Sequence, residues 1–125
     1  TLDFNYLWEE MSIPITYKAD HARAEQILLE TAKRHTVATS RLGREALDEL
    51  QRRYLFQPEE VGPKVYYRLT DNWLELTVRF VVEEWGIRAV KDAMSRDVVH
   101  GFKEAGIEIA SQTIDIVGFP SLHIQ

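Results

Sequence analysis

The sequence predicts an α+β domain of the ferredoxin-like type, a split βαβ sandwich with one extra helix inserted. The first observation is the order of hydrophobic periods along the chain, which reads strand, helix, helix, strand, strand, helix, strand. The second is length, because 125 residues fit one domain with a single core. We therefore expect two helices on one face of a largely antiparallel four-stranded sheet, with the helix at 40–54 as the insertion.

The chain opens with a predicted strand and helix. Apolar and polar residues alternate from Met11 to Tyr17, the strand period. Pro14 has no N–H for a ladder, so this strand should lie at an edge or pair through its other side there. Asp20 is a good N-cap for a helix from about His21 to Thr36.

A second helix is predicted from about Ser40 to Tyr54. It carries an apolar stripe at helical spacing beside charged residues. The stripe consists of Ala46, Leu47, Leu50 and Tyr54. Residues 57–63 contain two prolines and a glycine and are predicted to be a loop.

A hairpin follows, with strands at 64–70 and 73–85 joined by a turn at Asp71-Asn72. Alternation in the second strand separates an apolar face from a polar one, which we expect to be mostly solvated. The apolar face comprises Leu74, Leu76, Val78, Phe80 and Val82, and the polar face Glu75, Thr77, Arg79 and Glu83.

The remaining elements are a third helix and a short last strand. Apolar residues recur at helical spacing after Gly86 until Gly106, a suitable left-handed stop. Residues 114–119 are predicted to be a strand, which Pro120 limits.

Composition excludes several classes of function. A net charge of −5 disfavours nucleic acid as a partner, and the absence of cysteine removes disulfides and thiol chemistry. No apolar stretch approaches the roughly 20 residues that span a bilayer. Because the sequence starts at Thr1 without methionine, we expect it to be a piece of a longer protein, and N-terminal processing is the alternative explanation of this start.

Three segments resemble the soluble C-terminal part of the small-conductance mechanosensitive channel (MscS) family. They are 69–80 (LTDNWLELTVRF), 86–92 (GIRAVKD) and 102–111 (FKEAGIEIAS). Phe4–Tyr6 and Trp8–Glu10 look like the junction between that family's β domain and its α/β domain. The chain departs from the family in having Ala110-Ser111 where many members carry proline, and in a shorter stretch between Phe4 and Trp8.

The resemblance implies a domain from the cytoplasmic portion of a cell-membrane channel. Residues 1–10 would be the end of the preceding β domain, 11–120 the ferredoxin-like domain and 121–125 a tail. Copies of the full-length protein, typically seven, would form a vestibule through which ions reach the pore. The membrane would be reached only through regions absent here, and we expect the isolated piece to have too little interface to stay oligomeric.

Seven residues are candidates for a subunit contact or for the vestibule wall. They lie on the polar face, at the turn of the hairpin, or are the two tryptophans that bracket that face, where large aromatic residues favour interfaces. The candidates are Arg68, Asp71, Asn72, Trp73, Glu75, Arg79 and Trp85. The tryptophans are equally well explained as covers for the ends of the core, and a Glu75–Arg79 ion pair is expected at the surface.

No pattern points to catalysis, to a cofactor or to a metal. The four histidines have no pair at the spacing of a helical metal site, and they are expected to be solvated or capping. The serines lack a nucleophile-elbow context, and no glycine-rich phosphate cradle follows a strand. The hairpin strand lacks the aromatic motif of RNA-recognition domains. A regulatory domain that binds a small ligand remains an alternative, because fold does not fix function.

Overall fold

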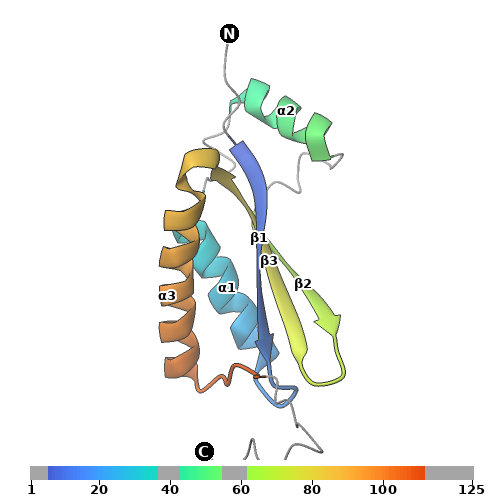
Figure 1. Ribbon diagram of the computed structural model, residues 1–125, viewed down its shortest axis with the longest axis vertical. Coiled ribbons are helices and arrows are strands. Elements are labelled where there is room, and N and C mark those ends of the chain that lie inside the picture. Colours follow the sequence, from blue (N-terminus) through green and yellow to red (C-terminus); the bar gives the residue numbers. More distant parts are fainter. Residues whose placement is uncertain (1–5, 37–42, 55–61, 112–125) are drawn as a thin grey trace, which may run out of the picture.

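The computed structural model describes residues 6–36, 43–54 and 62–111. In this part, three strands form an antiparallel sheet in the order β1-β3-β2, with β1 at Tyr6–Ile15, β2 at Lys64–Leu69 and β3 at Leu74–Glu83. Two helices, α1 (His21–His35) and α3 (Ile87–Ala105), lie side by side on one face (Figure 1). The predicted α+β ferredoxin-like class is confirmed, and the predicted strand at 114–119 lies outside the described residues.

The first strand is longer than predicted. It begins at Tyr6 and pairs with β3 along its whole length, so 6–10 continue the sheet rather than precede it. The Pro14 carbonyl accepts the Ala110 N–H at 2.9 Å, on the side away from β3. The missing N–H of proline therefore removes no bond from the β1–β3 ladder, which fits the second predicted arrangement, pairing through the other side at this point.

The two helices of the sandwich begin and end where the sequence predicts. Asp20 caps α1 by accepting the Arg23 N–H at 3.1 Å. Gly106 ends α3 at φ +71°, a left-handed conformation that favours glycine. Between the helices, a Cβ added to Gly101 would lie 3.0 Å from the Ile27 side chain, so glycine at this position permits the close approach of α3 to α1.

The main core lies between this helix pair and the sheet. Alternate residues of β3 supply the sheet side, and the predicted apolar face is buried throughout. Its buried residues include Ile13, Ile15, Leu28, Leu76, Val78, Phe80, Met94, Val98 and Phe102. Full burial of a side chain of this size contributes roughly 1.5–3 kcal/mol, which makes this cluster the main source of stability.

The inserted helix covers the other face of the sheet at one end. This helix, α2 (Arg44–Tyr54), begins later than predicted and lies beside the start of β1 (Figure 1). Leu50 and Val81 are buried there, with Tyr6 and Trp8 packed against them. The expectation that this face of β3 is mostly solvated is therefore wrong at its α2 end. Among the helices of the described residues, none combines the length and the apolar character that crossing a membrane requires.

Candidate interaction surface

The part of the second sheet face nearest the hairpin turn carries a polar row. Arg68 and Glu75 face each other across β2 and β3, and Arg68 Nε donates to Glu75 Oε1 at 2.8 Å. The Arg68 side chain is 69 % exposed and that of Glu75 22 %. One step along the sheet, the hydroxyls of Ser12 and Thr77 are 2.8 Å apart. Glu75 thus pairs with Arg68 rather than with Arg79, so the predicted Glu75–Arg79 pair is wrong.

Arg79 is buried, contrary to the expectation of a solvated side chain. Its residue exposure is 9 %, and its guanidinium carbon lies 3.8 Å from the centroid of the Trp8 ring. Nη1 donates to the Tyr66 hydroxyl at 2.6 Å, and the Tyr66 ring is within 5.4 Å of the guanidinium. Aromatic faces attract a cation electrostatically, so Trp8 and Tyr66 hold this charge away from water. Arg79 thereby acts as part of the packing under the α2 end of the sheet.

The hairpin turn is fixed by side chains at its base. The Tyr17 hydroxyl donates to the Thr70 carbonyl and accepts the Thr70 N–H at 3.1 Å. Thr70 Oγ1 accepts the Trp73 N–H at 3.0 Å. Asp71 and Asn72 are exposed at the tip, whereas Trp73 is half-buried. The buried Trp73 Nε1 has no hydrogen-bond partner within the described residues.

The two candidate tryptophans differ in environment. Trp85 lies in the short 3₁₀ turn η3 (Glu84–Gly86), past the far end of β3, and is 69 % exposed. It therefore does not cover the core, which was one of the two predicted explanations. A tryptophan this exposed is a candidate anchor for a partner, because large aromatic residues dominate interface energies.

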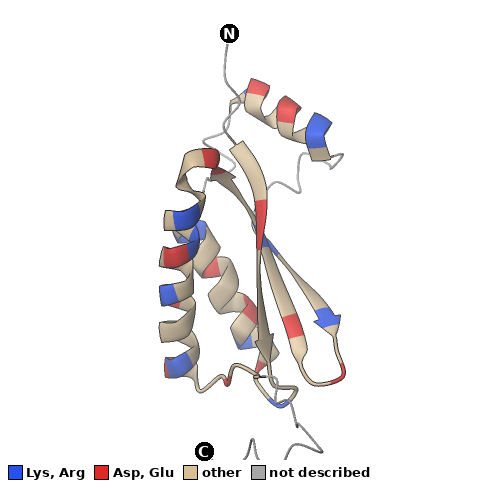
Figure 2. Cartoon of the chain, in the orientation of Figure 1, with Lys and Arg blue, Asp and Glu red and all other residues tan. Residues whose placement is uncertain are grey.

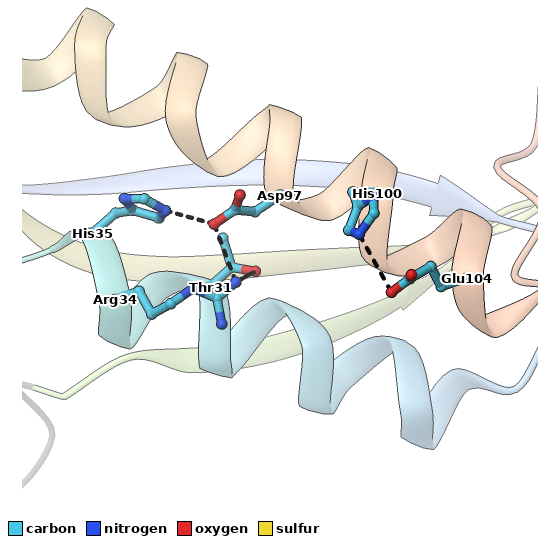
Figure 3. A network of polar contacts seen from close by, with 6 residues as sticks. All are labelled: Thr31, Arg34, His35, Asp97, His100 and Glu104. Carbon is cyan, nitrogen blue, oxygen red and sulfur yellow. Dashed lines mark hydrogen bonds and ion pairs between the residues drawn. The ribbon is translucent and has the colours of Figure 1, made fainter.

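A polar network that the sequence does not reveal joins α1 to α3 (Figure 3). Asp97 Oδ2 lies 2.6 Å from His35 Nε2 and 3.1 Å from Arg34 Nη2. These two partners, His35 before Arg34, hold the pKa of Asp97 below its ordinary value. On the next turns of α3, His100 Nε2 approaches Glu104 Oε1 at 3.4 Å. His35 is therefore a hydrogen-bond partner of Asp97, whereas it was expected to be solvated or capping.

A second cluster fastens β2 to the start of α1. The Tyr67 hydroxyl donates to Glu25 Oε1 at 2.7 Å and lies 3.3 Å from His21 Nδ1. Burial, followed by the hydrogen bond and the charge of Glu25, raises the pKa of Tyr67 to about 12. The spacing of His21 and Glu25 on one helix face is visible in the sequence, but nothing local indicates that Tyr67 meets them.

A cleft of about 300 Å³ lies where the end of α1 meets the start of α3. It is lined by Arg34 and His35 of α1 with the following Thr36, by Tyr6 and Glu83 of the sheet, and by Gly86 and Val90 at the start of α3. In the described residues, no three His, Asp or Glu side chains lie together as a metal-ion cage would require. The cleft offers the Arg34 guanidinium and the His35 ring to a small anion or polar molecule, with the Glu83 carboxylate in the same lining.

The structure brings together only some of the predicted candidates. Arg68 and Glu75 form one pair near the turn that carries Asp71 and Asn72, whereas Arg79 is buried and Trp85 lies at the opposite end of β3. Figure 2 shows both signs of charge on each of α1, α2 and α3. A mixed pattern of this kind is typical of an ordinary solvated surface. The chain matches no protein-family model and no curated protein sequence.

Proposed function

We propose that this chain is a soluble cytoplasmic domain of an MscS-like mechanosensitive channel and forms part of an oligomeric ion vestibule. The observation that carries the proposal is the resemblance of residues 69–80, 86–92 and 102–111 to that family. In the fold, residues 69–80 form the hairpin turn and most of β3, and residues 86–92 begin α3. Residues 102–111 contain the end of α3 and Ile109, which bridges to Ile15 of β1.

The surface chemistry supports a structural role of this kind. A vestibule wall needs a rigid domain, exposed charge toward the ion path and contacts to neighbouring copies, and it needs no catalytic group. The Arg68 side chain offers exposed charge on a two-stranded ribbon, and Trp85 offers an exposed aromatic anchor. The clamp of Tyr17 on Thr70 holds that ribbon against the rest of the domain.

The direct test uses the full-length protein that the gene encodes. We expect apolar segments of about 20 residues before this domain. In detergent the protein should have a light-scattering mass near that of seven copies, and patches of membrane that contain it should conduct under tension. A full-length protein without such segments, or one that is a soluble dimer, would refute the channel assignment.

A matched set of variants tests the polar row. Arg68→Glu places a carboxylate opposite Glu75, whereas the swap Arg68→Glu with Glu75→Arg keeps the ion pair and reverses its direction. If the row faces the ion path or a neighbouring copy, the single variant changes ion preference or assembly of the full channel. Because the double variant keeps an ion pair, it distinguishes the effect of breaking the pair from the effect of changing the charge at position 68. Unchanged assembly and ion preference in both variants would show that the row faces neither.

The cleft beside Arg34 and His35 favours one second candidate, a regulatory domain that binds a small anionic ligand. Its test is thermal unfolding of the chain in a concentration series of inorganic phosphate and of small dicarboxylates. A ligand that raises the melting temperature in the wild type but not in Arg34→Ala would favour this candidate, because binding to the folded state alone stabilises it. No shift with any ligand would count against it.

A further inference from the structure

Among the residues that the structure describes, no strand pairs with the outer edge of β2. In the sheet order β1-β3-β2, β2 has β3 on one side only. The N–H of Thr70 bonds to the Trp73 carbonyl, which fixes the alternation of hydrogen bonds along this hairpin. By that alternation, Lys64, Tyr66 and Arg68 exchange bonds with β3, and the amides of the residues between them point outward. The outward residues are Val65, Tyr67 and Leu69.

Large apolar and aromatic side chains are exposed along this edge strand. Leu69 is 75 % exposed, and Tyr66 and Tyr67 are 40 % and 43 % exposed. A strand edge with unpaired backbone groups and exposed apolar residues is a template for pairing with another strand. Within β2 there is no proline or glycine that would prevent such pairing.

The sequence of β2 is complementary to itself about Tyr67. In an antiparallel pair of two β2 strands centred there, Tyr67 faces its own copy and Val65 faces the partner's Leu69. On the other face, Tyr66 lies opposite the partner's Arg68. Each of these cross-strand pairs is favourable: aromatic with aromatic, apolar with apolar, and cation with aromatic. No two like charges are opposed in this register, since Lys64 meets the partner's Thr70.

We propose that β2 is a docking edge for a second copy of this chain, through antiparallel β2–β2′ pairing in the register centred on Tyr67. The product is one continuous sheet in the order β1-β3-β2-β2′-β3′-β1′, with the helices of both copies on the same face. The exposed Leu69 then gains a partner in Val65 of the other copy. One short strand pair buries less than the ~1,600 Å² of a standard interface, so the dimer dissociates on dilution.

This pairing joins two chains about a two-fold axis and does not rest on the proposed function. A cyclic ring uses different, head-to-tail contacts. The experiments below use the 125-residue chain alone, so a failed channel assay and a failed dimer assay have separate meanings.

Single cysteines test the register directly, because the chain has none of its own. In a hydrogen-bonded pair at the two-fold axis the two Cα atoms are ~5.5 Å apart, within disulfide range. Tyr67→Cys should therefore oxidise readily to a covalent dimer. Tyr66→Cys is the matched control, since its two copies are diagonal neighbours ~7–8 Å apart and point to the other face. Equal cross-linking of both variants, or of neither, would overturn the proposed register.

Sedimentation across a concentration series tests the dimer without cysteine. The wild type should shift from monomer to dimer as concentration rises, and Leu69→Lys should stay monomeric. Val99→Lys is the control, because Val99 is also exposed but lies on α3. Circular dichroism establishes that all three chains are folded. A wild type that is monomeric throughout, or a Val99→Lys variant that loses the dimer equally, would overturn the proposal.

Discussion

The guanidinium carbon of Arg79 lies 3.8 Å from the ring centroid of Trp8, on the sheet face opposite α1 and α3. A buried cation is costly unless other groups replace its hydration. Here the Trp8 ring and the Tyr66 hydroxyl, 2.6 Å from Nη1, take the place of water. The arrangement links β1, β2 and β3 on the side that lacks the main helix pair.

Tyr66→Phe should therefore destabilise the fold. The substitution keeps the ring near Arg79 and removes the hydroxyl that accepts from its guanidinium, and hydrogen bonds to charged groups contribute about 1.5–3 kcal/mol. Urea denaturation measures the loss in the free energy of unfolding. Lys64→Met is the control, because this exposed cation also lies over the Tyr66 ring, at 5.6 Å, and its removal should cost less than about 0.5 kcal/mol. Equal stability of Tyr66→Phe and the wild type would contradict the role given to Tyr66.

The sequence predicts the core face of β3 and misses its other face for a physical reason. Alternation shows which residues share a face, and Leu76, Val78 and Phe80 are all buried as predicted. Whether the second face is covered depends on α2, which reaches it from elsewhere in the chain and buries Val81. Alternation carries no information about that contact, nor about the contacts of Trp8 and Tyr66 that bury Arg79, so the expectation of a solvated face fails here.

The candidate site was predictable to a similar degree. The polar row at Arg68 and Glu75 follows from strand alternation and hairpin register, both of which are local. The pairing of His35 with Asp97 joins residues 62 positions apart and leaves no local signal. The contact of Tyr67 with Glu25 likewise requires β2 to lie against α1, which the sequence alone does not specify.

Tyr17→Phe should loosen the hairpin while leaving the core intact. The Tyr17 hydroxyl is the side-chain partner of both the N–H and the carbonyl of Thr70. Because the Thr70 N–H also bonds to the Trp73 carbonyl, the expected loss in stability is about 1 kcal/mol. Amide hydrogen exchange should accelerate at Thr70 and its neighbours in β2, with little change in α3. Uniform acceleration over the whole chain would mean that Tyr17 supports the fold globally.

Asp97→Asn should reduce stability at neutral pH and lose that effect in acid. His35 and Arg34 lower the pKa of Asp97 in the folded protein. A carboxylate with a lowered pKa contributes stability above its unfolded pKa of 3.8, and this contribution disappears as pH falls through the folded value. Denaturation of wild type and variant from pH 7 downward should therefore show a difference that shrinks in strong acid. Asp92→Asn is the control, since Asp92 pairs with Arg96 on its own helix. A difference that grows toward low pH would contradict this linkage.

Glu25→Gln should bring the pKa of Tyr67 part of the way back from about 12 toward its ordinary value of 10.0. Burial is the largest cause of the shift and remains in the variant, whereas the negative charge beside the phenol is removed. A folded-state pKa above the unfolded one means that Tyr67 contributes stability below pH 10, and that this contribution is lost as pH rises through 12.

Tyrosine-labelled NMR titration resolves Tyr67 from the other four tyrosines. Glu30→Gln, at an exposed position of the same helix, controls for general charge. An unchanged Tyr67 titration in Glu25→Gln would show that the carboxylate does not hold this phenol, and that the contact between β2 and α1 has another cause.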